Sequence, residues 1–178
     1  MEGWHDFFLG ELGAAAALTG LLFVSVSVNQ ARILELGRMA DRGVESLIML
    51  MLVFAVSSAP LVPGQPLRLL GGEVLVAGAV TLCLLVRLQH SYLKDLEAIY
   101  RPRTMNMVWL NRMAVGPTVL AGLALAWTGQ PWGLYFLPPG ILLSIVAAAA
   151  VLKDGYKGLV AEYGACVSPW RPTSDARS

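Results

Sequence analysis

Five long apolar segments constrain the fold of this chain more than any other feature. They cover about residues 7–28, 44–61, 69–86, 107–127 and 132–152. A bilayer core about 30 Å thick is crossed by roughly 20 helical residues, close to the length of each segment. Their hydrophobicity is continuous and lacks the two-residue alternation of barrel strands. The sequence therefore predicts an all-α integral membrane helical bundle with five transmembrane helices in residues 1–152, followed by a tail in residues 153–178.

The composition excludes several classes of protein. Only 14% of the residues are charged and the mean hydropathy is +0.63, whereas soluble domains carry about 25% charged residues. A net charge of +1 is too balanced for nucleic-acid binding. No nucleotide-binding, serine-hydrolase or zinc-protease motif is present. His5 and His90 fall on opposite predicted sides, and Glu2, His5 and Asp6 make only a weak metal cluster, better explained as a solvated N-terminus. We therefore expect a non-enzymatic protein with no cofactor, no metal and no nucleic-acid partner.

The basic residues predict the orientation in the membrane, because Lys and Arg near span ends stay in the cytoplasm. With five spans, all but one of the 13 basic residues fall on one side, and the exception is Arg68. That side holds Arg32, Arg38, Arg42, Arg87, Lys94, Arg101, Arg103, Arg112, Lys153, Lys157, Arg171 and Arg177. The N-terminus is therefore expected outside and the C-terminus in the cytoplasm of a bacterial cell, in a multi-pass protein of the inner membrane.

Some alternatives stay open at this level. The first apolar segment lacks the basic start of a secretory signal and is longer than a usual signal core, which favours a retained span. The segment around Pro138 and Pro139 could lie in the membrane interface, which would leave four spans and place the basic tail outside. The loop over 88–106 has apolar residues at helical spacing and is expected to extend the third helix. Cys83 and Cys166 are not expected to pair.

Three charged residues make the sharpest site hypothesis, because ionisable groups within a bilayer are costly and often functional. Glu11 lies about one turn inside the outer interface, Glu73 opens the third span at the same level, and Arg68 precedes it closely. The cluster could admit a proton or cation. A structural ion pair that ties two helices together is the favoured alternative.

The first span has two further features. A face of small residues suits close helix contact; it comprises Gly10, Gly13, Ala14, Ala17 and Gly20. The span ends in Ser25, Ser27 and Asn29, a polar exit that could line a pore but is better explained by hydrogen bonds between helices. Helix breaks are expected at Pro117 and at Pro138 and Pro139, where freed carbonyls could face a cavity.

Three stretches carry a family resemblance. They are GAAAALTGLLFVSVSVN at 13–29, LVPGQ at 61–65 and GLYFLPPGILLS at 133–144. Together they resemble a group of small, uncharacterised bacterial multi-span proteins, some of which are automatically labelled as modulators of the FtsH-type membrane protease. The resemblance covers most of residues 1–152, includes no catalytic motif and stops before the tail.

Two functions follow from these observations. The first is a non-enzymatic interaction or regulatory subunit that docks on itself or on another membrane protein. The alternative is a homo-oligomeric ion channel or small transporter that uses Glu11, Glu73 and the polar exit. The channel requires a homo-oligomer, because five short spans hardly enclose a wide path alone.

Overall fold

The described part of the chain contains five helices long and apolar enough to cross a membrane, as the sequence predicts. The computed structural model describes residues 2–28, 38–94, 101–150 and 153. Within these ranges there is no strand. The helices are α1 (Glu2–Val28), α3 (Arg38–Ser58), α4 (Leu67–Lys94), α5 (Arg101–Thr128) and an unlabelled helix at 137–150. Two short 3-10 helices are η1 (Ala59–Leu61) and η2 (Pro131–Phe136).

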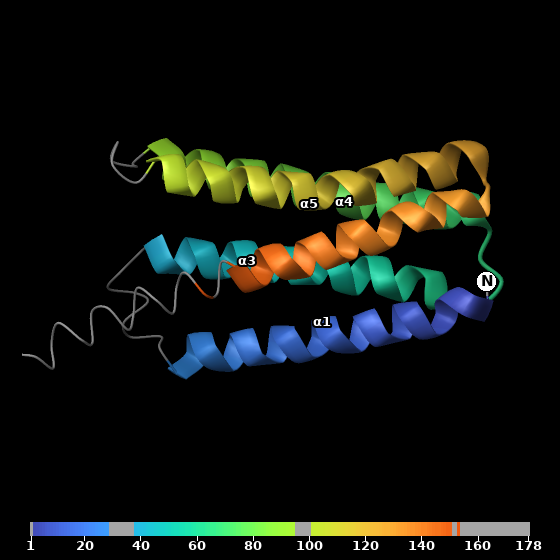
Figure 1. Ribbon diagram of the computed structural model, residues 1–178, viewed down its shortest axis with the longest axis horizontal. Helices are drawn as coiled ribbons and strands as arrows, with labels where there is room; N and C mark the ends of the chain where they lie inside the picture. The colour runs from blue at the N-terminus through green and yellow to red at the C-terminus, as the bar shows by residue number, and fades with distance from the viewer. Residues whose placement is uncertain (1, 29–37, 95–100, 151–152, 154–178) are drawn as a thin grey trace, which may run out of the picture.

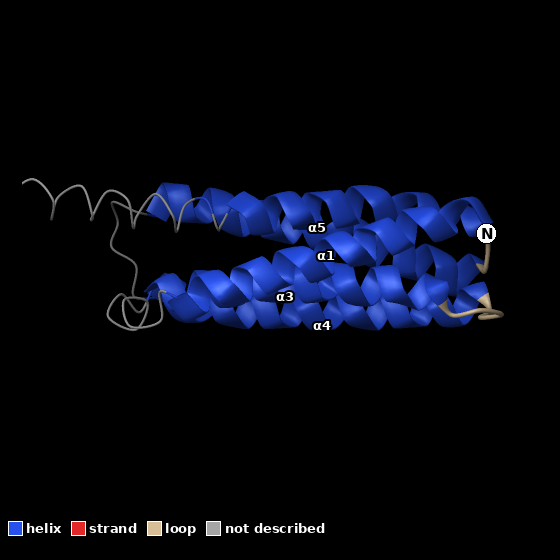
Figure 2. Cartoon of the chain, turned by 90° about the horizontal axis from the view of Figure 1, so that it is seen from below, coloured by secondary structure: helices blue, strands red, loops and turns tan. Residues whose placement is uncertain are grey.

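The helices lie side by side along one long axis (Figures 1 and 2). Helix α1 packs on α3, α3 on α4, and α4 on α5. The helix at 137–150, orange in Figure 1, packs against α5 and contacts α3, where Ser46 Oγ donates a 3.4 Å hydrogen bond to the Ala148 carbonyl. The N-terminus and both short connections, after η1 and after α5, lie at the same end of the bundle (Figure 1). We refer to this as the N-terminal end.

Helices α4 and α5 extend beyond the apolar segments that predict them. Helix α4 continues to Lys94 and α5 already begins at Arg101. Residues 88–94 extend the third helix, as predicted, whereas residues 101–106 belong to α5 and residues 95–100 lie outside the described part. Hydropathy marks the portion of a helix that suits lipid, and a helix can continue past it.

The turns at the N-terminal end follow from local sequence. Pro66 cannot continue the preceding chain as a helix, and its carbonyl accepts the first hydrogen bonds of α4, from Leu69 at 3.0 Å and Leu70 at 3.1 Å. Helix α5 ends at Thr128, and the next residue, Gly129, has φ of +64°. Its N–H donates to the Leu125 carbonyl at 2.9 Å, the bond that closes a helix at a left-handed glycine.

The prolines at which helix breaks are expected lie at two kinds of position. Pro117 lies inside α5, and the helix continues through it from Arg101 to Thr128. Pro138 and Pro139 lie in the first turn of the helix at 137–150, directly after η2. A proline in the first turn costs little, because its missing N–H would have no partner within the helix. The change from 3-10 to α-helix therefore falls just before the two prolines.

The closest helix packing joins α4 and α5. A Cβ built on Gly71 would lie 2.7 Å from the Leu125 carbonyl carbon, and one on Gly122 would lie 2.6 Å from the Leu75 backbone nitrogen. Glycine lets the two backbones approach this closely, as in other membrane helix pairs. At the N-terminal end, Trp4 of α1 meets Tyr135 of η2 with ring centroids 5.1 Å apart.

Candidate functional site

The three charged residues of the predicted outer cluster lie on different surfaces of the bundle. Glu11 is half-buried on α1, while Arg68 and Glu73 are exposed on α4. Among the described residues, the only salt bridge within 4.0 Å joins His5 and Asp6. Glu11, Arg68 and Glu73 therefore form no such ion pair with one another.

Arg68 lies across the turn that ends α5. A Cβ added at Gly129 would be 3.1 Å from both the Cγ and the Nε of Arg68. The arginine stem thus covers the left-handed glycine and packs against the α5–η2 connection, away from Glu73. Long basic side chains often bury an apolar stem in this way while the charged head stays accessible.

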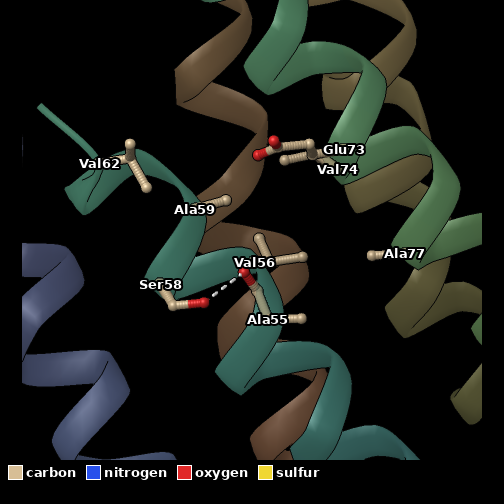
Figure 3. Close-up of a pocket in the computed structure, with 8 residues that line it drawn as sticks. All are labelled: Ala55, Val56, Ser58, Ala59, Val62, Glu73, Val74 and Ala77. Atoms are coloured by element: carbon tan, nitrogen blue, oxygen red, sulfur yellow. Dashed lines mark hydrogen bonds between the residues drawn. The ribbon is translucent and has the colours of Figure 1, made fainter. Parts of the chain in front are cut away.

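Glu73 lines a hollow between α3 and α4. The hollow has a volume of about 330 Å³. Figure 3 shows the Glu73 carboxylate pointing from α4 toward η1, across a space bordered by small side chains such as Ala55 and Ala59. The carboxylate therefore enters a hollow between two helices, and does not meet Glu11 or Arg68 in an ion pair.

The predicted polar exit lies at the other end of α1. Ser27 is exposed, and the helix ends at Val28. Ser25 is in the helix, and nothing further is described of its side chain; Asn29 lies outside the described residues. The pore-lining role of these residues stays a prediction.

A buried polar chain that the sequence reasoning missed joins three helices. Glu45 of α3 is 3% exposed and Gln89 of α4 is fully buried. Gln89 Nε2 donates to Glu45 Oε1 at 2.7 Å, and Arg112 Nε of α5 donates to Gln89 Oε1 at 3.1 Å. The Gln89 amide uses one donor and its acceptor to bridge a carboxylate and a guanidinium. Opposite charges are thereby linked through a neutral side chain inside the bundle.

Further polar side chains gather at the same level. Gly140 faces Thr118 and Gly133 faces Leu125, and this antiparallel register sets Asn111 level with Ala147. Asn111 is fully buried, and neither amide atom has a hydrogen-bond partner among the described residues. Ser46 bonds the neighbouring Ala148 carbonyl. The end of the bundle opposite the N-terminus thus has a polar interior layer.

Two signals in the sequence point to this layer. Glu45 lies near the start of its apolar segment, and Arg112 lies within the fourth one, so each is an ionisable residue at a span end. For the predicted orientation Arg112 counts only as a basic residue near a span end. The count of basic residues does not show which face of the helix Arg112 occupies. Only the register of α3, α4 and α5 brings positions 45, 89 and 112 together.

The small-residue face of α1 has no neighbour among the described residues. The buried residues Phe8, Ala15 and Leu22 recur every seven positions, as expected for the face on α3. The small residues lie on the opposite face and are exposed; they are Gly10, Gly13, Ala14, Ala17 and Gly20. A Cβ built on any of the three glycines of this face would meet nothing within 4 Å. Residues suited to close helix packing therefore lie on a surface against which no described part of the chain packs.

Comparison with protein-family models, with curated proteins and with solved structures gives no match. The resemblance to small bacterial multi-span proteins stays a prediction. Within the described part of the chain, no three His, Cys, Asp or Glu side chains lie close enough to hold a metal ion.

Proposed function

We propose that this chain is a non-enzymatic interaction subunit of a bacterial inner-membrane complex, and that it docks through the small-residue face of α1. The simplest partner is the same face of a second copy, because a stripe of small residues is self-complementary across a twofold axis. The observation that carries the proposal is the open space around Gly10, Gly13 and Gly20.

The contrast with other glycines of the same protein supports this role. Gly71 and Gly122 each touch the backbone of a neighbouring helix, whereas the glycines on α1 touch nothing. Helix α1 is also the least buried candidate span. In its 18-residue apolar stretch 17% is buried, against 33–44% in the corresponding stretches of the other four. In lipid there is no hydrophobic drive to cover such a face, so association depends on backbone approach.

A bulky residue on this face is expected to prevent self-association. Gly13→Ile should shift the purified protein from dimer to monomer in mild detergent, because a branched side chain keeps the helices apart. Gly72→Ile is the matched control: Gly72 of α4 also has nothing within 4 Å. Sedimentation equilibrium in detergent measures both variants, and a native protein that is monomeric at all concentrations would contradict self-docking.

The alternative channel function also requires an oligomer, but it predicts ion conduction by that oligomer. It requires ion flux through the purified protein in liposomes, with loss of flux in Glu11→Gln and Glu73→Gln. Flux that survives Gly13→Ile would separate the two functions, because the channel would then not depend on α1 docking. An oligomer without flux supports the interaction subunit.

The proposed orientation has the N-terminus outside and the C-terminus in the cytoplasm, since all but one of the basic residues flank one set of span ends. In a Cys83→Ser protein, Cys166 is the single thiol. A charged, membrane-impermeant maleimide should label it only after the membrane is opened. A cysteine placed at Gln130, with both native cysteines replaced by serine, should react in intact cells. The reverse pattern would contradict this orientation.

A further inference from the structure

A groove runs along the outer surface of the bundle between α3 and α4. The hollow at Glu73, about 330 Å³, adjoins a second of about 390 Å³, and both are lined by Ala55 and Ala77. Together they fall in the size range of small-molecule sites, roughly 300–1,000 Å³. The facing positions Ala55 and Ala77 carry small side chains, while Gly71 and Gly78 of α4 are turned toward α5.

The groove is apolar along most of its length and acidic at one end. The second hollow is bordered mainly by large apolar side chains such as Met51, Val80 and Leu84. In the first hollow the ionisable group is Glu73. The nearby Ser58 hydroxyl already donates to the Ala55 carbonyl at 3.0 Å (Figure 3). An apolar body with a positive charge at one end is complementary to this surface.

The Glu73 carboxylate has no protein cation within 4.0 Å among the described residues. Arg68, five residues earlier on α4, lies against the Gly129 turn that follows α5. Glu73 follows the first residue of α4 by six positions, which is about 9 Å along the helix axis. A charge inside a bilayer is costly, up to about 3.5 kcal/mol for Asp at the centre of a span and less toward its end. A cation that enters the groove from the lipid side and pairs with Glu73 would therefore have to be soluble in the hydrocarbon region.

We propose that the α3–α4 groove binds a membrane-soluble organic cation, with its apolar body between Ala55 and Ala77 and its charge beside Glu73. An aminophospholipid fits less well, because its ammonium stays at the headgroup level, above this depth. A hydrated metal ion fits less well still. Such an ion needs several oxygen ligands, and the rest of the groove does not supply enough of them. The site is separate from the docking face of α1, and either proposal can fail without the other.

The test uses the full chain in phosphatidylcholine nanodiscs with labelled dodecyltriphenylphosphonium as the probe, a lipophilic cation whose charge lies at one end of an apolar chain. Saturable binding is expected, and Glu73→Gln should weaken it about tenfold or more through loss of the charge pair. Asp6→Asn is the charge control: it removes an exposed carboxylate at the N-terminal end of the bundle that does not line the groove. Unchanged binding in Glu73→Gln would overturn the proposal.

A second pair of variants tests the groove itself. Ala77→Trp should abolish binding by filling both hollows, whereas Ala79→Trp, exposed on the same helix and outside the lining, should leave it intact. Thermal unfolding of both variants shows whether they are folded. Two results identify a different occupant and overturn the proposal. One is phosphatidylethanolamine that copurifies with the native protein but not with Glu73→Gln, when neither protein binds the probe. The other is dissociation of an oligomer by Ala77→Trp without probe binding.

Discussion

Replacement of Gln89 by leucine is expected to lower the free energy of unfolding by about 2–5 kcal/mol. Leucine fills a similar volume, so the loss reflects hydrogen bonding and not a cavity. The variant leaves the buried Glu45 carboxylate without its donor at 2.7 Å and the Arg112 Nε without its acceptor at 3.1 Å. Unfolding in mixed detergent and SDS micelles, followed by circular dichroism, measures the change.

Glu45→Gln is the matched control for this prediction. A glutamine oxygen still accepts the hydrogen bond from Gln89, and the substitution removes a buried charge. Its cost is expected to be only about 1 kcal/mol. If Gln89→Leu unfolds no more easily than Glu45→Gln, the hydrogen-bonded chain contributes little to holding α3, α4 and α5 together.

The two adjacent glycines of α4 should respond to alanine in opposite directions. Gly71→Ala is expected to destabilise the protein by about 1–3 kcal/mol or more, because the added Cβ would lie 2.7 Å from the Leu125 carbonyl carbon and closer still to the Ala126 nitrogen. The α4 and α5 backbones would have to separate. Gly72→Ala meets nothing within 4 Å and is expected to stabilise by up to about 1 kcal/mol through helix propensity.

The same unfolding measurement checks both glycine variants. The pair shares its helix, its neighbours in sequence and its substitution, so the comparison isolates the helix contact. Equal effects of the two alanines would show that α4 and α5 do not pack as closely as described.

The helical class of the fold could be predicted because it depends on local composition. Each span is a continuous apolar segment. In lipid, only helices and closed β-barrels satisfy all backbone hydrogen bonds, and barrel strands would alternate apolar and polar residues. Hydropathy alone does not predict the helix ends: α4 runs on to Lys94, beyond the apolar segment, and only the helical spacing of residues after 88 indicates this continuation. Turn chemistry explains the ends that are well defined, such as Gly129 after α5.

The arrangement of the candidate sites could not be predicted, because it depends on helix rotation. Arg68 and Glu73 are close in sequence, yet Arg68 lies on the Gly129 turn and Glu73 in the α3–α4 hollow. Positions 45, 89 and 112 are far apart in sequence and meet in one hydrogen-bonded chain. Close glycine contacts such as Gly71 on Leu125 set the register that decides both outcomes.

The short connection after α5 has a consequence for how the protein is made. Only Gly129 and Gln130 separate α5 from η2, and only residues 62–66 separate η1 from α4. Neither link is long enough to cross a bilayer, so in a membrane each pair of helices has to enter as a hairpin. Helix α1 has no such hairpin partner among the described connections and leaves the ribosome before the other four helices. Its small-residue face is thus available to another membrane helix before the remaining four helices have been synthesised.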